Sequence, residues 1–214
     1  MSSREQILNQ LRQAPQPFGD VAPITERRHM VPLVDTSPEA LRTLFVENAE
    51  KLLCVVEQPQ NAEEAIEKIL TIIGGDKNVT AWDFEHIPLP GLPETLAQNA
   101  ITVAEADNPE IKVGITGAAT ALAATGSLVV INRPGQSSYS SLLPEVHIAV
   151  ITADQITTDL EDWMVEQRQQ GLDKFRQSSN TTIISGPSRT GDIAMEIVMG
   201  AHGPAELHII LLPS

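Results

Sequence analysis

The sequence predicts an α/β fold, a three-layer sandwich in which a mostly parallel sheet lies between helical layers. Two observations lead to this prediction. Short apolar runs typical of strands alternate with segments whose apolar residues recur at helical spacing. Two of the runs, 127–132 and 146–153, are apolar almost throughout, as in strands covered on both faces. The last two expected strands are joined by a short turn, which predicts an antiparallel pair at the C-terminal end of the chain.

The first 36 residues are expected to form an arm that precedes a domain of residues 37–214. Within the arm, residues 2–12 predict an amphipathic helix, because Ile7, Leu8 and Leu11 form one stripe. A helix this short is marginal in water, so the stripe should dock onto the domain or onto another chain. The stretch 14–34 contains four prolines and no periodicity, and we expect it to be extended.

Polar residues mark where the helices of the domain begin. Three pairs match the preferred first turn of a helix: Ser37 with Pro38, Asn61 with Glu64, and Thr158 with Glu161. One more short helix is expected over 92–100. In chain order, the expected strands cover residues 51–58, 78–84, 101–106, 111–119, 127–132, 146–153, 181–186, 194–200 and 206–212.

Charge limits the classes of partner. The chain has 14 basic and 28 acidic side chains, and its net charge of −14 argues against nucleic acid and anionic membranes as partners. The same charge favours a basic protein partner. No apolar run approaches the ~18 residues of a membrane span. The N-terminus lacks the apolar core of a signal peptide, so a cytoplasmic protein is expected.

The thiol and imidazole side chains do not form a recognisable metal site. Cys54 is the only cysteine, which excludes an internal disulfide and an iron–sulfur cluster ligated by cysteines of this chain alone. Its apolar neighbours predict a buried, inert thiol. The five histidines show no metal-ligand spacing, so no metal site is expected. His147 and His208 stand on apolar strands, where we expect satisfied core histidines.

Two loops of the predicted sheet are candidates for a site, because open α/β sheets bind ligands where strands end. The glycine-rich stretch 114–127 fits an anion held by backbone amides, with a following helix adding its dipole. It fits equally well the tight packing of a strand on a helix. The stretch 133–144 places four serines around Tyr139, which fits either a solvated loop or a hydroxyl-rich binding loop.

A third candidate, the stretch 184–204, gathers polar residues near the C-terminus. Arg189 beside a Gly-Pro turn is able to clamp a carboxylate or phosphate with two hydrogen bonds, or to pair with Asp192. Ser188, Asp192 and His202 lack the sequence context of a hydrolase triad. The stretch therefore fits either turn chemistry around a buried strand or the edge of a small-anion site.

Three segments together resemble the LUD-domain family, that of lactate utilization protein C. They are GITGAATALAATGSLVV, SLLPEVHIAVITADQI and GPSRTGDIAMEIVMGAHGPAELHIILL, and the resemblance covers roughly residues 37–212. It implies a Rossmann-like sandwich similar to the NagB/RpiA/CoA-transferase fold and a role in oxidising L-lactate to pyruvate. It also implies two partners, one related to cysteine-rich oxidoreductase subunits and one carrying iron–sulfur clusters. No cofactor is expected in this chain itself.

The resemblance supports a site for a small carboxylate or a partner. Its expected binding residues are Gly117, Thr125, Gly126, Ser127, Ser188, Arg189 and Thr190. His202 is the expected proton carrier. Members of the family usually carry an acidic residue where this chain has Ala124, a difference that weighs against independent catalysis.

Three functions are consistent with these observations. The leading hypothesis is a non-redox subunit of an iron–sulfur-dependent complex that oxidises L-lactate. A second is a self-sufficient transferase or ligase resembling folate cyclo-ligases or CoA-transferases. The third is a regulatory or scaffold protein that uses only the fold.

Overall fold

A six-stranded parallel sheet forms the centre of the computed structural model, which describes residues 3–14, 32–191 and 197–214. Its strand order is β1-β12-β7-β4-β2-β3, and every paired neighbour is parallel. In that order the strands are β1 (Val55–Glu57), β12 (Glu206–Leu212), β7 (Val146–Thr152), β4 (Val113–Thr116), β2 (Asn78–Ala81) and β3 (Thr102–Ala104). The α/β class and the mostly parallel sheet are therefore confirmed.

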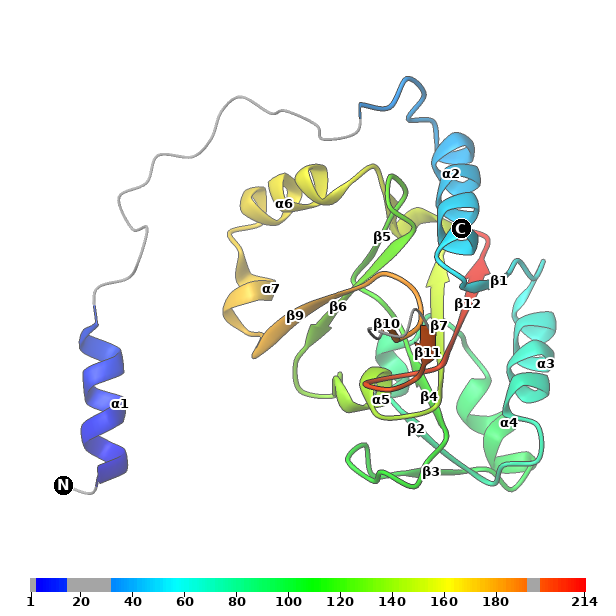
Figure 1. The fold of residues 1–214 in the computed structure, drawn as a ribbon, viewed down its shortest axis with the longest axis horizontal. Helices are drawn as coiled ribbons and strands as arrows, with labels where there is room; N and C mark the ends of the chain where they lie inside the picture. The colour runs from blue at the N-terminus through cyan, green and yellow to red at the C-terminus, as the bar shows by residue number, and fades with distance from the viewer. Residues whose placement is uncertain (1–2, 15–31, 192–196) are drawn as a thin grey trace.

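Helices cover both faces of this sheet (Figure 1). Helices α3 (Ala62–Ile73) and α4 (Leu92–Gln98) pack on one face through a cluster of buried aliphatic side chains. Helix α2 (Pro38–Lys51) packs on the other face. The predicted caps of α2 and α3 are confirmed, because Ser37 and Asn61 accept hydrogen bonds from the backbone of the first turn.

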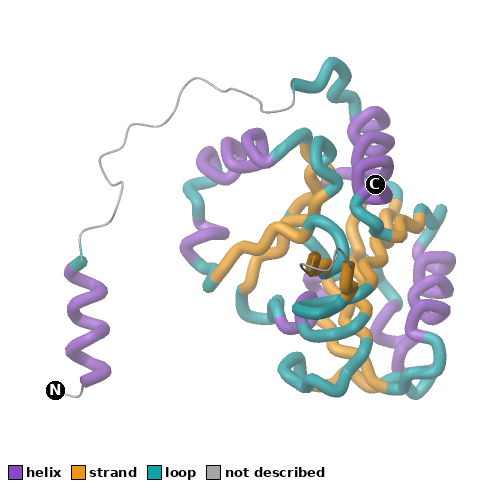
Figure 2. The backbone as a smooth tube through the Cα atoms, in the orientation of Figure 1, coloured by secondary structure: helices purple, strands orange, loops and turns teal. Residues whose placement is uncertain are grey.

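A second sheet that the sequence did not predict lies on the α2 side of the first. Its strand order is β8-β5-β6-β9, and β6 pairs antiparallel with both of its neighbours. The strands are β5 (Thr120–Leu122), β6 (Ser127–Asn132), β8 (Ile156–Thr157) and β9 (Asn180–Ile184). Helices α6 (Leu160–Gln169) and α7 (Asp173–Arg176) flank it, with the rings of Trp163 and Phe175 5.3 Å apart. Figure 2 shows the strands of both sheets in the middle of the domain and helices at its flanks.

The predicted antiparallel pair near the C-terminus is present, but its members differ from those expected. Strand β11 (Ile197–Met199) pairs with β10 (Arg189–Gly191) in a separate two-stranded ribbon. Strand β12 instead lies parallel between β1 and β7, because its apolar side chains are buried on both faces of the large sheet. Residues 194–196, which begin the expected strand, lie outside the described residues.

Three other local predictions are corrected. The strand expected over 51–58 is confined to β1, because α2 continues through Lys51 and the chain turns at Leu53, whose φ is 69°. No helix follows Gly117; the chain forms the β5–β6 hairpin there. The cap of α6 is Asp159 rather than Thr158, since the Asp159 carboxylate accepts from the Asp162 amide.

The predicted N-terminal helix is present as α1 (Ser3–Gln13), and it buries none of its side chains. Most of the stretch expected to be extended, 14–34, lies outside the described residues. Two short 3₁₀ turns complete the elements, η1 (Phe84–His86) and η2 (Ala153–Gln155). Within the ranges that the structure describes, every helix is too short or too polar to cross a membrane.

Candidate functional site

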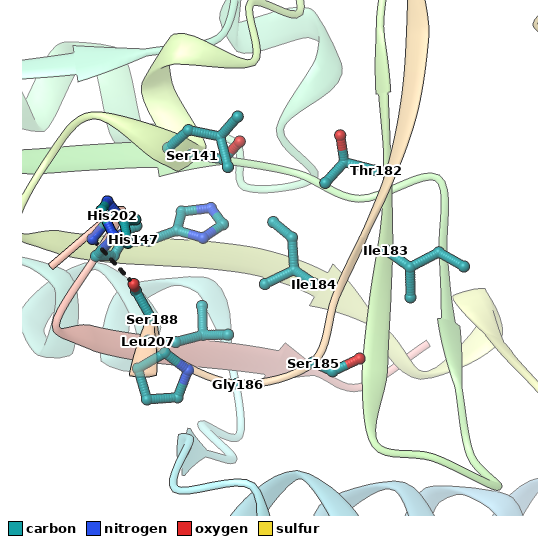
Figure 3. Close-up of a pocket in the computed structure, with 14 residues that line it drawn as sticks. Ser141, His147, Thr182, Ile183, Ile184, Ser185, Gly186, Ser188, His202 and Leu207 are labelled. Atoms are coloured by element: carbon teal, nitrogen blue, oxygen red, sulfur yellow. Dashed lines mark hydrogen bonds between the residues drawn. The ribbon is translucent and has the colours of Figure 1, made fainter. Parts of the chain in front are cut away.

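A cavity of about 200 Å³ lies where the segment after β9 meets α5 (Tyr139–Leu142) and the loop before β12 (Figure 3). This volume is below the ~300–1,000 Å³ typical of sites for drug-sized ligands, so it suits a small molecule. The cavity opens at the amino ends of β7 and β12, since His147 and Leu207 are their second residues. This cavity therefore does not lie at the carboxyl ends of the parallel strands, where a site was expected.

His147 forms part of the cavity wall, and its ring is fully buried. Its Nε2 lies 2.8 Å from the hydroxyl of Thr116, in a hydrogen bond between β7 and β4. Its Nδ1 has no hydrogen-bond partner. Burial lowers the pKa of His147 to about 3, so the imidazole is neutral at physiological pH. The expectation of a satisfied core histidine is therefore half right: the ring is buried, but one of its nitrogens has no hydrogen-bond partner among the described residues.

Packing of a short helix against glycine shapes the same wall. Gly114 pairs with His147 across β4 and β7, and a Cβ at Gly114 would overlap the carbonyl oxygen of Ser140. The missing side chain thus lets α5 lie directly on the sheet, which brings Ser141 and Leu142 to the cavity. Ser140 and Ser141 are buried, so the stretch 133–144 is not the solvated loop that was one of its two interpretations.

Ser188 organises the mouth of the cavity. Its amide donates to Pro204 O at 2.8 Å, and its carbonyl accepts from the Gly200 amide at 2.9 Å. Its hydroxyl accepts from the His202 amide at 3.3 Å (Figure 3). Ser188 and His202, two of the predicted site residues, therefore lie together at the cavity. The His202 side chain is exposed, whereas His147 is buried.

The next two predicted residues, Arg189 and Thr190, lie on β10 and do not line the cavity. Arg189 is exposed, and its positive charge opposes the effect of burial on Cys54. Burial still dominates and raises the pKa of the Cys54 thiol to about 11. Cys54 is buried, as predicted, and remains a protonated, inert thiol at neutral pH.

The four predicted residues of the glycine-rich stretch do not all reach the cavity. Ser127 is joined to the cavity region, because its hydroxyl lies 2.8 Å from that of Ser185, a lining residue. Gly126 has φ 65° and closes the β5–β6 hairpin against α2, where a Cβ would overlap backbone atoms of Asn48 and Ala49. Thr125 is exposed in that turn.

Gly117 follows β4 directly and packs against the carbonyl of His86. Ala124 lies in the hairpin turn, where its amide donates to Thr158 O at 2.9 Å and its carbonyl accepts from Asn48 at 3.3 Å. Of the glycine-rich stretch, then, Gly117, Thr125 and Gly126 lie outside the lining of this cavity.

A more open depression of about 400 Å³ lies at the carboxyl ends of β2 and β3. Asp83, Glu105 and Arg133 line it, and none of the three is among the predicted binding or catalytic residues. Asp83 and Glu105 are exposed, and the Nε of Arg133 donates to Gln136 at 2.8 Å. This depression lacks a buried unpartnered group, so the cavity at His147 is the stronger candidate.

The cysteine content of the chain does not fit an iron–sulfur cluster, and the described residues contain no group of metal ligands. Cys54 supplies the one thiol, and a cluster needs four cysteine ligands or their equivalents. Within residues 3–14, 32–191 and 197–214, no three or more His, Cys, Asp or Glu side chains are grouped as metal ligands.

The family model described as the LUD domain matches residues 42–212. The chain belongs to the LUD domain family. Lactate utilization protein C of Halalkalibacterium halodurans is 28% identical over 178 residues, covering 78% of this chain and 77% of that one. An uncharacterized protein of Escherichia coli K12 is 26% identical over 232 residues, with 99% of each chain covered.

A solved structure has the same fold as this LUD domain chain. The crystal structure of a DUF162 family protein from Deinococcus radiodurans matches with a TM-score of 0.63 and 21% sequence identity. The match covers 83% of this chain and 99% of that chain.

Proposed function

We propose that this chain is a non-redox subunit of an iron–sulfur-dependent assembly that oxidises L-lactate to pyruvate, and that the cavity binds a small carboxylate. Membership of the LUD domain family and relatives named lactate utilization protein C support the lactate part of the proposal. The cavity supports the ligand part.

One observation carries the proposal: two of the three segments that mark the family resemblance line one cavity, and the third bonds to residues of its lining. The segment before β7 supplies Leu142 and His147, and the C-terminal segment supplies Ser188 and His202. The glycine-rich segment supplies Thr116, which bonds His147 directly. Turn chemistry alone does not require three distant segments to surround a buried polar nitrogen.

Under this proposal, the oxidation of lactate requires a partner that accepts the electrons. Lactate oxidation removes two electrons, which a cofactor must accept. This chain has one cysteine, whose raised thiol pKa keeps it protonated, so its own residues do not fit a cluster. The electrons then pass to groups held by iron–sulfur and cysteine-rich oxidoreductase subunits.

The surface of the chain has two properties suited to such a partner. Its net charge of −14 attracts a basic patch, with an attraction that weakens as salt is raised. Strand β11 exposes three successive apolar side chains close to the cavity mouth: Ile197, Val198 and Met199.

Complementation of a deletion strain tests the proposal. Cells lacking the gene should grow poorly on L-lactate and normally on pyruvate, and the wild-type gene should restore growth on lactate. Tagged protein should co-purify iron–sulfur subunits from lactate-grown cells, with recovery falling between low and high salt. Normal growth of the deletion strain on lactate, or repeated purification without any iron–sulfur subunit, would contradict the proposal.

A further inference from the structure

The lining of the cavity at His147 contains hydrogen-bond donors but no acidic side chain, although the chain as a whole is strongly acidic. The sequence contains 28 Asp and Glu residues, yet none lines the cavity. The polar lining is made of serine and threonine hydroxyls, two histidines and backbone groups. Leu142, Ile184 and Leu207 add apolar wall. Such a lining suits a small molecule with an anionic head and a short hydrocarbon part.

Hydrogen-bond counting assigns the tautomer of His147. The bond to His147 Nε2 is the single hydrogen bond found for the Thr116 hydroxyl among the described residues, and Thr116 is fully buried. If Nε2 carried the proton, the Thr116 proton and the Nδ1 lone pair would both lack partners. If Thr116 donates to Nε2, only one group remains unmet, the Nδ1–H. Since each unmet buried polar group is costly, the second arrangement is favoured.

The ring that carries the unpartnered Nδ1–H lies at the wall of the cavity. His147 is a lining residue, and in Figure 3 its ring lies between His202 and Ile184, within the group of side chains that surrounds the cavity. Ser188 lines the same cavity. Its hydroxyl oxygen accepts from the His202 amide, which leaves the hydroxyl proton available as a second donor.

We infer that His147 binds the carboxylate of the ligand through Nδ1–H, and that Thr116 is the positioning residue that fixes this tautomer. This inference rests on the proposed binding of a small carboxylate. It assigns His147 a binding role and not a proton-transfer role. A carboxylate oxygen supplies the acceptor that the buried Nδ1–H lacks, which makes the bond a strong, charge-assisted one.

Two pairs of matched variants separate this role from a structural one. Asn places its amide NH₂ near the position of Nδ1 in the histidine ring, whereas Gln places it near Nε2. His147→Asn therefore retains the donor toward the ligand, and His147→Gln moves it toward Thr116. Thr116→Ser keeps the hydroxyl that fixes the tautomer, and Thr116→Val removes it.

The first measurement is the ring-nitrogen NMR spectrum of the full-length chain with ¹⁵N-labelled histidine at pH 7. The wild type and Thr116→Ser should show His147 as the Nδ1–H tautomer, and Thr116→Val should populate the Nε2–H form. An Nε2–H tautomer in the wild type would overturn the assignment. This readout needs no ligand, so it is independent of the proposed function.

The second measurement is a titration with L-lactate, pyruvate and acetate, with propane-1,2-diol as the control that lacks a carboxylate. The acids should shift the His147 Nδ1 signal and the diol should not. His147→Gln should weaken binding about tenfold, as expected for loss of a hydrogen bond to a charged group. His147→Asn should recover most of that affinity, with thermal melting confirming that both variants fold.

Equal loss in folded Asn and Gln variants, or shifts by the diol as large as by the acids, would overturn the binding role. If no acid shifts the signal, the carboxylate inference is wrong, while growth on lactate and co-purification still decide the proposed function separately.

Discussion

The floor and the rim of the cavity differ in almost every physical respect. The floor, formed by Ser141, His147 and Leu207 with Thr116 bonded to His147 behind it, is at most 2% exposed and belongs to the packed sheet and to α5. The rim, formed by Ser188, His202 and Gly203 and continued by the adjoining β10–β11 ribbon, is largely exposed, and Ile197 on that ribbon is 71% exposed. The floor is therefore suited to fix a small ligand, and the rim is suited to contact a protein. Variants of the two regions should separate these tasks.

The largest effect is expected at the floor, from Gly114→Ala. The added Cβ would overlap the carbonyl of Ser140 and lie 2.8 Å from Pro144, so α5 or β4 must move. We expect a loss of about 1–3 kcal/mol in the free energy of unfolding, measured in urea, together with weaker ligand binding. Gly75→Ala, whose Cβ would meet no atom within 4 Å, is the matched control. Equal stability of the two variants would show that α5 does not rest tightly on the sheet.

The pH dependence of the free energy of unfolding should also depend on His147, which lies in the floor of the cavity. Burial lowers the pKa of His147 in the folded state to about 3, below its value of 6.5 in the unfolded chain. Between these values the unfolded state binds one more proton, so stability is complete above pH 6.5 and falls as the pH decreases toward 3. His147→Asn should remove about 1.4 kcal/mol per pH unit from the slope near pH 5. An unchanged slope in urea titrations would place His147 in contact with solvent.

At the rim we expect a functional effect without loss of stability. Arg189→Lys should impair growth on L-lactate as strongly as Arg189→Ala, because lysine cannot reproduce a planar, two-point contact. Arg189 is exposed, so the free energy of unfolding should change by no more than about 0.5 kcal/mol. Arg176→Lys, at an exposed pair with Asp173 on α7, is the control and should grow normally. Normal growth of Arg189→Lys would exclude the two-point role.

The smallest effect on stability is expected from deleting residues 1–30. Helix α1 buries none of its side chains, and Ile7 and Leu11 are 57% and 66% exposed. Its stripe therefore needs a surface on another chain, and deletion should change the mass in solution, alone or with the partner, while the melting temperature stays nearly constant. Light scattering measures the mass. If neither the mass in solution nor the melting temperature changes, the apolar stripe of α1 does not dock onto the domain or onto another chain.

Elements with a strong local signal were predictable from the sequence. Helix α3 has a capping asparagine, apolar residues at intervals of three and four, and Gly74 at its end, and the structure places it within one residue of that expectation. The apolar strands β6, β7 and β12 were predicted almost to their bounds for the same reason. The cap of α6 was misplaced by one residue, because Thr158 and Asp159 are adjacent residues of equally suitable type.

Features that depend on pairing between distant segments were not predictable. Strand β5 is Thr-Ala-Leu, which carries little strand signal, so the second sheet was missed. The hydrogen bonding of His147 depends on the register of β4 and β7, which pairs His147 with Gly114 and places the Thr116 hydroxyl 2.8 Å from Nε2. Ser188 and His202 were predicted together because they flank one short segment of chain, and their shared hydrogen bond depends on contacts local to it.

Incubation of the purified chain with ¹³C-labelled L-lactate and an excess of a dye acceptor, followed by ¹³C NMR, tests the central claim most directly. The account predicts that the lactate signals broaden through exchange with the bound state and that no pyruvate signal appears. Adding the co-purified iron–sulfur subunits to the same sample should then produce pyruvate. Pyruvate formed by this chain alone would contradict the account, because the chain would then carry out the two-electron oxidation itself.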